Sequence, residues 1–355
     1  MKRAADLVRD EIRALTAYHV APAAGLVKLD AMENPYRLPP ELARELGEFL
    51  ATIAINRYPD PVAPRLKASL RDAMGIPAHL EVLLGNGSDE ILQIIAMALA
   101  KPGATMLAVE PSFALYRMSA AMTGMRYVGV SLREDLSLDV GAMLAAVERH
   151  RPAITWIAYP NNPTGALFPA QDIRRLIGAS PGLVVIDEAY YAFSGGATFL
   201  AEVADHPNVV LVRTVSKLGL AGLRVGLAIG PREWLDEFEK VRLPYNVNVL
   251  SAAAAEFVLA HRAVLDEQTQ ALVHERARIE RALDTMPGVR RFPSAANFVL
   301  VRVADAPRAF EHLKASGILV RIFHGSHPLL AHCLRLTVGT PDENRRLLEA
   351  LARVA

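Results

Sequence analysis

A lysine in the segment 214–224 could form a covalent bond with an aldehyde. Lys217 directly follows an apolar run and stands in glycine-bearing sequence between Ser216 and Arg224. A lysine amine forms an imine with a carbonyl group, and removal from water beside other cations keeps the amine reactive. Ser216 and Arg224 could both hold a phosphate, Arg224 through its planar guanidinium. A solvated lysine in a loop explains this segment about as well, so the segment alone leaves both interpretations open.

A carboxylate ends a second apolar run. The sequence Val-Val-Ile-Asp-Glu-Ala-Tyr at 184–190 places Asp187 at the end of an expected strand, with Tyr190 three residues later. An aspartate there can pair with the protonated nitrogen of a pyridine ring, and a tyrosine can donate to the phenolic oxygen of such a ring. An aspartate that caps the turn after a strand is the common alternative.

Two loops could complete such a site. Asn162 lies in the turn-rich loop Tyr-Pro-Asn-Asn-Pro-Thr-Gly at 159–165, where its amide could contact the same phenolic oxygen. Gly87, Ser88 and Asp89 open an expected helix, and the free backbone N–H groups at a helix start bind anions. This second loop matches neither the dinucleotide fingerprint nor the P-loop. Ordinary turn chemistry and an ordinary helix cap remain the alternatives for the two loops.

The elements expected around these residues alternate between strands and helices. Short apolar runs predict strands at 105–109, 126–130, 154–159, 183–187, 209–213 and 225–230. Helical patterns lie between most of them, at 89–100, 112–123, 139–150 and 170–179. This alternation predicts an α/β fold with a mostly parallel central sheet covered by helices. Ligands bind beyond the carboxyl ends of the strands in such sheets, where these motifs lie.

The pattern changes from about residue 248. A long helical region is expected at 249–286, followed by strands at 298–303, 318–322 and 333–338. The last helix begins at 340–343 with Thr-Pro-Asp-Glu, a capping-box signal with proline at the first helical position. We therefore expect an N-terminal segment, 1–35, that packs with a small domain, a large cofactor-binding domain, 36–248, and a small α+β domain, 249–355.

Composition narrows the class of protein. The 355-residue chain has 52% hydrophobic residues and a formal net charge of +1, which gives no general attraction to nucleic acid or anionic membrane. The single cysteine, Cys333, excludes an intrachain disulfide, and no metal site is expected. No apolar run approaches the ~20 residues that span a bilayer, and charges near the N-terminus leave no signal core. We expect a cytoplasmic protein.

Taken together, the four motifs resemble those of one family. Their order along the chain (GNGSDE, YPNNPTG, DEAY and SKLGLAGLR) resembles the fold type I pyridoxal-phosphate aminotransferases of class I/II, and more narrowly the histidinol-phosphate aminotransferases. The resemblance continues through further segments, at 29–35, 56–60, 244–248, 294–298 and 335–340. It therefore covers nearly the whole chain and implies pyridoxal 5'-phosphate as the cofactor.

The resemblance implies a role for each residue of the cofactor site. Lys217 would carry the Schiff base and then move a proton between the substrate and the cofactor. Asp187 would hold the pyridine nitrogen, while Asn162 and Tyr190 would contact the phenolic oxygen. The cofactor phosphate would be held by Gly87, Ser88, Asp89, Ser216 and Arg224.

Two further aromatic residues have implied roles. Tyr116 would stack on the cofactor ring, although an aromatic residue on the apolar face of a core helix is the alternative. Tyr58 would reach the phosphate of the cofactor in the neighbouring subunit, which would make a homodimer necessary for activity. A loop tyrosine before Pro59 is the alternative for Tyr58.

The substrate side of the site is less clearly marked. Arg335 would receive the anionic group of the substrate, and Arg321 is a second candidate for a substrate phosphate. Tyr18 and Asn297 are further candidates for the substrate pocket. The chain departs from the family where Met32 replaces the first asparagine of Asn-Glu-Asn-Pro, and the sequence around Tyr18 lacks the expected Pro-Tyr-x-Pro-Gly. Both departures put the exact substrate in doubt.

The implied reaction is transamination between L-histidinol phosphate and 2-oxoglutarate. It gives imidazole-acetol phosphate and glutamate, a step of histidine biosynthesis. Cofactor motifs do not separate this reaction from that of an aromatic amino-acid aminotransferase or a threonine-phosphate decarboxylase. A cofactor-sensing regulator is a third alternative, but the helices before the fold are too short for a DNA-binding module and no basic stripe appears. Small-molecule substrates and a second copy of the chain are the expected partners.

Overall fold

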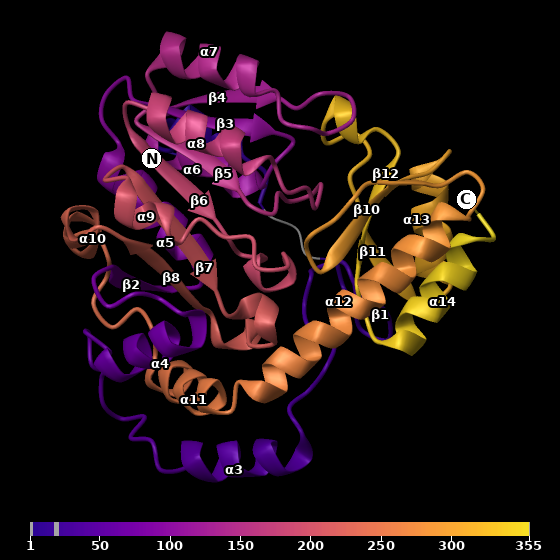
Figure 1. Cartoon of the computed structure of the whole chain (residues 1–355), viewed down its shortest axis with the longest axis horizontal. Coiled ribbons are helices and arrows are strands. Elements are labelled where there is room, and N and C mark those ends of the chain that lie inside the picture. The colour runs from indigo at the N-terminus through magenta and orange to yellow at the C-terminus, as the bar shows by residue number, and fades with distance from the viewer. Residues whose placement is uncertain (1–2, 18–20, 355) are drawn as a thin grey trace.

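The computed structural model describes residues 3–17 and 21–354, which form two β-sheets with helices packed against them (Figure 1). Within these residues the larger sheet has seven strands in the order β2-β8-β7-β6-β5-β3-β4, and the smaller has five in the order β1-β11-β12-β10-β9. The larger sheet comprises β2 (Glu81–Asn86), β3 (Thr105–Glu110), β4 (Arg126–Ser131), β5 (Ile154–Ala158), β6 (Leu183–Asp187), β7 (Val209–Thr214) and β8 (Val225–Gly230). The smaller comprises β1 (Val27–Leu29), β9 (Arg290–Arg291), β10 (Phe298–Arg302), β11 (Ile318–Ile322) and β12 (Cys333–Thr337).

The large sheet is mostly parallel, as predicted. Strands β7, β6, β5, β3 and β4 pair in parallel, whereas β8 is antiparallel to both of its neighbours, β7 and β2. All five residues of β6 are buried, which explains why the parallel strands appear in the sequence as continuous apolar runs. The predicted α/β fold class is confirmed. The sequence did not predict β2, which lies at the edge of this sheet and pairs with β8.

Helices cover both faces of the large sheet (Figure 1). One face packs against α5 (Ser88–Leu99), α6 (Ala114–Thr123) and α10 (Arg232–Glu239); the other packs against α4 (Pro64–Met74), α7 (Val140–His150), α8 (Ala170–Ala179) and α9 (Glu202–Asp205). Alternate side chains of β6 enter the two cores, because successive residues of a strand point to opposite faces. Val184 lies in the core beneath α4 and α7, and Val185 lies in the core beneath α5 and α6.

The helical region after residue 248 differs from its prediction. It is two helices, α11 (Val249–Ala260) and α12 (Ala263–Asp284), which are separated at His261 and Arg262. Helix α11 packs against α4 and α3 (Pro40–Leu50), and its Val258 and Leu259 belong to the large-domain core. Residues 249–260 therefore belong with the large sheet rather than with the small domain. We place the domain boundary within α12, which crosses between the two sheets in Figure 1.

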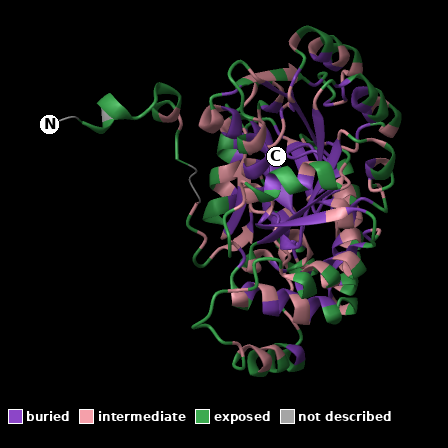
Figure 2. Ribbon diagram, turned by 90° about the vertical axis from the view of Figure 1, so that its left-hand side faces the viewer, coloured by how far each residue is buried: buried purple, intermediate pink, exposed green. Residues whose placement is uncertain are grey.

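The small sheet packs against the end of α12 and two further helices. These are α13 (Ala306–Ala315) and α14 (Pro341–Leu351), and α14 begins with the predicted capping box between Thr340 and Glu343. Strand β1 pairs in parallel with β11, so a segment near the N-terminus completes this sheet. Before it, α1 (Ala4–Leu7) and α2 (Asp10–Arg13) form a mostly exposed arm, seen at the left of Figure 2. Among the described residues, no helix is long and apolar enough to cross a membrane.

Candidate active site

Several predicted site residues come together at one edge of the large sheet. Asp187 ends β6, Lys217 follows β7 and Asn162 follows β5. Gly87 follows β2, which runs in the same direction as β7, and Arg224 directly precedes the antiparallel β8. The carboxyl ends of four strands and the amino end of β8 therefore meet at this edge. Ligands bind at this position in sheets of this kind.

Lys217 stands in a short 3₁₀ turn, η2 (Ser216–Leu218), between β7 and β8. Its Nζ donates a hydrogen bond to the carbonyl oxygen of Ala31 at 3.2 Å and lies 5.9 Å from the centre of the Tyr190 ring. Burial, and to a smaller extent the positive charge of Arg335, lowers the pKa of Lys217 from 10.5 to about 8. A larger fraction of this amine is therefore neutral and nucleophilic near pH 7 than in an ordinary lysine.

Asp187 is a buried carboxylate with two partners inside the protein. Its Oδ1 accepts a hydrogen bond from the backbone N–H of Ala189 at 3.1 Å, and its Oδ2 accepts one from the Tyr116 hydroxyl at 2.9 Å. Burial raises the pKa of Asp187 to about 6, against the opposing effect of the two hydrogen bonds. A cation placed against this carboxylate would keep it ionised.

The expectation that Tyr116 stacks on the cofactor does not agree with the structure. The Tyr116 side chain is fully buried, its ring lies parallel to that of Trp156, and its hydroxyl is bound to Asp187. A ring packed in this way offers no exposed face to a ligand. Phe113, the residue before α6, is only partly buried and touches the edge of Tyr116. Phe113 comes three residues after the end of β3, so its place beside Tyr116 at this sheet edge could have been predicted from the sequence. Sequence reasoning missed this residue.

Asn162 links the predicted cofactor residues to a predicted substrate residue. Its Nδ2 donates to the Tyr190 hydroxyl at 3.2 Å, and its Oδ1 accepts from Arg335 Nη1 at 2.6 Å. Arg335, on β12, is buried and also donates to the carbonyl oxygen of Asp30 at 2.8 Å. Arg321 on β11 lies directly opposite Arg335 in the sheet register. Two arginines of the small sheet thus lie side by side, and one of them reaches the loop after β5.

Asn297 holds the main chain rather than presenting its amide donor to a ligand. Its Nδ2 donates to the carbonyl oxygen of Met32 at 2.9 Å, and Thr337 Oγ1 accepts from the Met32 N–H at 3.1 Å. Met32 has φ +52°, a left-handed conformation that asparagine adopts more readily than methionine. The two polar side chains explain how methionine is kept there. Tyr18, the other weakly marked substrate candidate, lies outside the described residues.

The amino end of α5 is arranged as a cradle for an anion. Gly87 precedes the helix with φ +84°, and a Cβ on it would lie 2.5 Å from Arg224 Nη2. Arg224 Nη2 also donates to Asp89 Oδ2 at 3.2 Å. Ser216 is buried and bound to Thr214, whose hydroxyl donates to Ser216 Oγ at 2.8 Å. The glycine, the guanidinium and the free N–H groups of the first helical turn suit a phosphate.

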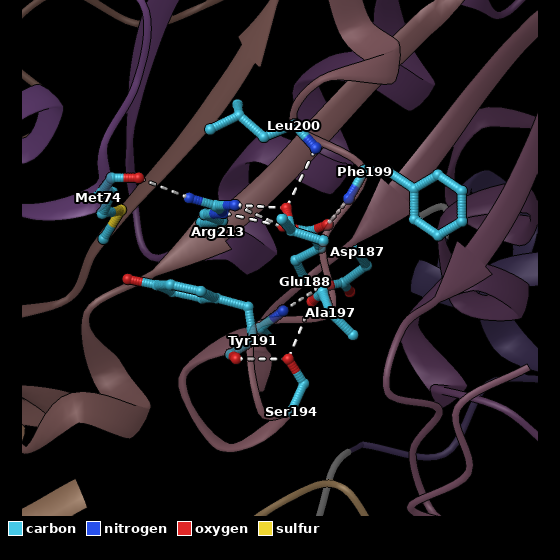
Figure 3. A network of polar contacts seen from close by, with 11 residues as sticks. Met74, Asp187, Glu188, Tyr191, Ser194, Ala197, Phe199, Leu200 and Arg213 are labelled. Atoms are coloured by element: carbon cyan, nitrogen blue, oxygen red, sulfur yellow. Dashed lines mark hydrogen bonds and ion pairs between the residues drawn. The ribbon is translucent and has the colours of Figure 1, made fainter. Parts of the chain in front are cut away.

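A buried ion pair fixes the strand ends beneath this edge (Figure 3). Arg213 on β7 donates from Nε and Nη2 to Glu188 Oε2 at 2.9 and 2.8 Å, and from Nη1 to the carbonyl oxygen of Met74 at 3.1 Å. Glu188 Oε1 accepts from the backbone N–H of Phe199 at 2.6 Å. Arg213 and Glu188 are 2% and 0% exposed, so water does not screen the pair. Glu188 follows Asp187 directly, so the two side chains point to opposite faces of the sheet. The ion pair of Glu188 with Arg213 therefore anchors the strand end that carries Asp187.

Tyr58 lies apart from the other predicted residues. Its side chain is 81% exposed and stacks on Tyr245 with ring centres 4.6 Å apart. Further exposed apolar side chains lie within five residues of Tyr58 or Tyr245 in the sequence: Ile55, Val62, Leu243 and Leu250. A cavity of about 450 Å³ lies in the same region, lined by residues that include Phe49, Pro59 and Tyr245. Within one chain, Tyr58 contributes nothing to the site around Lys217.

The assembled donor set fits pyridoxal phosphate. A half-buried amine of lowered pKa, a buried carboxylate, and an Asn–Tyr pair stand at the same sheet edge as a helix start that lacks a side chain at Gly87. The start of α5 packs closely against β8 because residue 226 is a glycine: a Cβ there would lie 2.3 Å from the backbone nitrogen of Ser88. The amine suits an aldehyde, the carboxylate a ring nitrogen, and the glycine cradle a phosphate.

Sequence comparisons place the chain among aminotransferases over nearly its full length. The sequence profile of "Aminotransferase class I and II" matches residues 24–351. The histidinol-phosphate aminotransferase of Chromobacterium violaceum is 54% identical over 347 residues, which cover 98% of this chain and 97% of that protein. Histidinol-phosphate aminotransferase 2 of Cupriavidus pinatubonensis is 52% identical, with 98% and 96% covered.

Structural comparisons agree with the sequence comparisons. The crystal structure of histidinol-phosphate aminotransferase from Sinorhizobium meliloti in complex with pyridoxal-5'-phosphate has a TM-score of 0.87 at 27% identity, and covers 98% of this chain and 97% of that one. The crystal structure of L-threonine-O-3-phosphate decarboxylase from Porphyromonas gingivalis has a TM-score of 0.78 at 25% identity, with 92% and 99% covered. The same fold therefore accompanies at least two reactions.

Proposed function

The chain belongs to the class I and II aminotransferases, and within them to the histidinol-phosphate aminotransferases; from this premise we propose its reaction. It transfers the amino group between L-histidinol phosphate and 2-oxoglutarate, giving imidazole-acetol phosphate and glutamate, in histidine biosynthesis. Pyridoxal phosphate is the proposed cofactor. The observation that carries the proposal is the half-buried Lys217, of lowered pKa, at the sheet edge that also holds Asp187 and the Asn162–Tyr190 pair.

Lys217 and Asp187 perform the proposed proton chemistry. When bound, pyridoxal phosphate supplies a conjugated ring that withdraws electrons from the substrate carbon bearing the amino group. Lys217 would hold the cofactor through its amine, and its Nζ would carry the proton that leaves this carbon. Asp187 holds a proton on the ring nitrogen, because its negative charge in a buried site favours the cationic ring. Tyr190 donates its hydroxyl proton toward the ring oxygen, and Asn162 orients Tyr190.

Arg335 and Arg321 are proposed to receive the anionic groups of both substrates. Histidinol phosphate brings a phosphate, and glutamate and 2-oxoglutarate bring carboxylates. A guanidinium binds either anion through two parallel hydrogen bonds. The neighbouring positions of Arg335 and Arg321 on β12 and β11 provide two such groups on one surface. Their placement supports anionic substrates over neutral side chains.

The active unit is proposed to be a homodimer in the cytoplasm. The exposed apolar side chains around Tyr58 form the patch that a second copy would cover, and we define this dimer patch as Ile55, Tyr58, Val62, Leu243 and Leu250. A monomer rarely leaves a group of this kind in water. In the dimer, Tyr58 would reach the cofactor phosphate of the partner subunit. The solitary Cys333 fits a reducing compartment.

A spectral titration of the cofactor-loaded enzyme tests the reaction and the substrate together. Histidinol phosphate should remove the visible absorbance of the lysine-bound cofactor and produce the amine form, and 2-oxoglutarate should restore the starting spectrum. Phenylalanine and threonine phosphate are the comparison substrates. Conversion by phenylalanine alone would move the protein to the aromatic aminotransferases, and carbon dioxide release from threonine phosphate would make it a decarboxylase. A Lys217→Ala enzyme that turned over normally would contradict the assignment of the lysine.

A further inference from the structure

Tyr116 has a contact that its expected role does not explain. Its hydroxyl donates to Asp187 Oδ2 at 2.9 Å, and both side chains are buried. The backbone N–H of Ala189 binds the other carboxylate oxygen at 3.1 Å. Each oxygen of Asp187 is thus fixed by one protein donor. A carboxylate oxygen accepts two hydrogen bonds, so each keeps capacity for a ligand.

The Tyr116 ring is held on two sides. One face lies parallel to Trp156, with an interplanar angle of 3° and ring centres 5.2 Å apart. Phe113 meets the same ring edge-on, with ring centres 5.8 Å apart. Both arrangements are favourable aromatic geometries. With Trp156 on β5 and Tyr116 on α6, the sheet and its covering helix together fix the phenol in place.

The Tyr116 hydroxyl remains a hydrogen-bond donor over the whole physiological pH range. Burial raises the pKa of Tyr116 well above 10, and the negative charge of Asp187 raises it further. The same hydrogen bond acts on Asp187 in the opposite direction, because a donor to a carboxylate stabilises its ionised form. Tyr116 therefore opposes the effect of burial on Asp187.

We propose that Tyr116 is a positioning residue that keeps Asp187 ionised and correctly oriented toward the ring nitrogen of the cofactor. Trp156 and Phe113 hold its ring, and its hydroxyl fixes Asp187 Oδ2. This inference rests on the proposed function, since Asp187 needs its charge only if it faces a protonated ring. Without the hydroxyl, the carboxylate is less acidic and freer to rotate, and the ring nitrogen holds its proton less firmly.

The test compares Tyr116→Phe with the wild-type holoenzyme. The phenylalanine variant keeps the ring between Trp156 and Phe113 and removes only the hydroxyl. The single-turnover rate with glutamate should fall by about tenfold to a hundredfold, the range expected for one hydrogen bond to a charged group. The pH midpoint of the visible absorbance of the lysine-bound cofactor should move upward, because a ring that holds its proton less firmly withdraws fewer electrons from the imine nitrogen.

Two further variants separate this role from a merely structural one. Tyr127→Phe is the matched control, because it removes the hydroxyl of another tyrosine that packs against the same core, and Tyr127 lies on β4 rather than on α6. Its single-turnover rate and pH midpoint should match those of the wild type. In an Asp187→Asn background the Tyr116→Phe change should have little additional effect, since both changes act through the same carboxylate.

The outcomes distinguish failure of this inference from failure of the proposed function. An unchanged rate and an unchanged pH midpoint in Tyr116→Phe would overturn the inference. An equal loss of rate in the wild-type and Asp187→Asn backgrounds would also overturn it, because Tyr116 would then act independently of Asp187. If the wild-type enzyme bound the cofactor without reacting with glutamate or histidinol phosphate, the proposed function would fail. The pH midpoint of the visible absorbance of the lysine-bound cofactor would still test whether Tyr116 acts through Asp187.

Discussion

At the scale of single residues, the environment of Lys217 determines how readily the enzyme takes up its cofactor. Burial and the nearby charge of Arg335 lower the pKa of Lys217 to about 8. Relative to an unperturbed lysine, this raises the neutral fraction at pH 7 by roughly two orders of magnitude. A neutral amine can attack an aldehyde and can accept a proton, which are the two roles proposed for Lys217.

This lowered pKa predicts how reconstitution depends on pH. Only the neutral amine attacks an aldehyde, so the rate at which the cofactor-free protein binds pyridoxal phosphate should rise with pH and level off above about 8. The measurement follows the growth of visible absorbance after mixing at a series of pH values. A rate still rising steeply at pH 10 would show that Lys217 has an ordinary lysine pKa.

The sequence predicted the positions of Lys217, Asp187 and Asn162 better than the contacts of the residues that support the site, such as Tyr116 and Asn297. Asp187 ends an apolar strand, and Lys217 and Asn162 come within four residues after one, so their position at the sheet edge follows from strand order. Tyr116 and Asn297 were assigned to ligands, whereas the structure shows their hydroxyl and amide bound to protein groups. Residue type and spacing do not show which of two nearby surfaces a side chain faces.

At the scale of elements, the buried pair of Arg213 and Glu188 joins β7, the end of β6, the end of α4 and the loop that contains Phe199. Removing one member leaves a buried charge without its partner, so Glu188→Gln or Arg213→Met should lower the free energy of unfolding by about 3–5 kcal/mol. Urea unfolding of the purified variants measures the change.

A surface pair provides the control for this prediction. Arg44→Ala removes an exposed i,i+4 contact with Glu48 in α3 and should cost less than about 1 kcal/mol. The combined Glu188→Leu, Arg213→Met protein should lose less than the sum of its single replacements, because neither charge is then left unpaired. Equal costs for the buried and exposed pairs would contradict the assigned role of Arg213 and Glu188.

The close approach of α5 to β8 makes a second prediction at this scale. Gly226→Ala places a Cβ against the backbone of Gly87 and Ser88, so the amino end of α5 must move. Because that helix start is the proposed phosphate cradle, we expect cofactor affinity to fall at least about tenfold, equivalent to about 1.4 kcal/mol. Equilibrium dialysis or absorbance titration measures the affinity.

Gly222→Ala is the matched control for the glycine prediction. Gly222 lies in the turn that leads into β8, four residues before Gly226, and a Cβ added there meets no atom within 4 Å. The variant should bind the cofactor as the wild type does. Equal losses in Gly226→Ala and Gly222→Ala would show that backbone freedom, rather than contact with α5, determines the affinity.

The elements differ in how far the sequence predicted them. The buried parallel strands were predicted nearly to the residue, because a short continuous apolar run between turns is typical of a strand that is buried on both faces. Strand β2 was missed, since its pairing with β8 involves residues far away in the chain. The break between α11 and α12 was also missed, because His261 and Arg262 interrupt neither the composition nor the helical periodicity strongly.

At the scale of the whole molecule, the dimer patch should control both assembly and activity. Leu243→Asp or Ile55→Asp places a charge among the exposed apolar side chains around Tyr58 and should shift the protein toward monomer. Sedimentation velocity measures the assembly, and activity should fall with the dimer fraction because Tyr58 is expected to act on the partner subunit.

An exposed apolar residue elsewhere provides the comparison for the dimer prediction. Met97 is 50% exposed on α5, which covers the sheet face opposite α4, so Met97→Asp should leave the mass in solution unchanged. Tyr58→Phe should preserve the dimer and weaken only cofactor binding, because it removes the hydroxyl alone. A fully active monomer would contradict the expectation that Tyr58 acts across the interface.

The pairing of β1 with β11 also determines the order in which the two sheets can form during synthesis. Domains tend to fold as their sequence leaves the ribosome, so the strands of the large sheet are all available once β8 has emerged. Strand β1 is made first but must wait for β11, and Arg335 comes later still. A growing chain therefore has the seven large-sheet strands and Lys217 before Arg335, the residue proposed to bind the substrate anion, has been made. The growing chain should therefore be able to hold the cofactor before it is able to bind and convert a substrate.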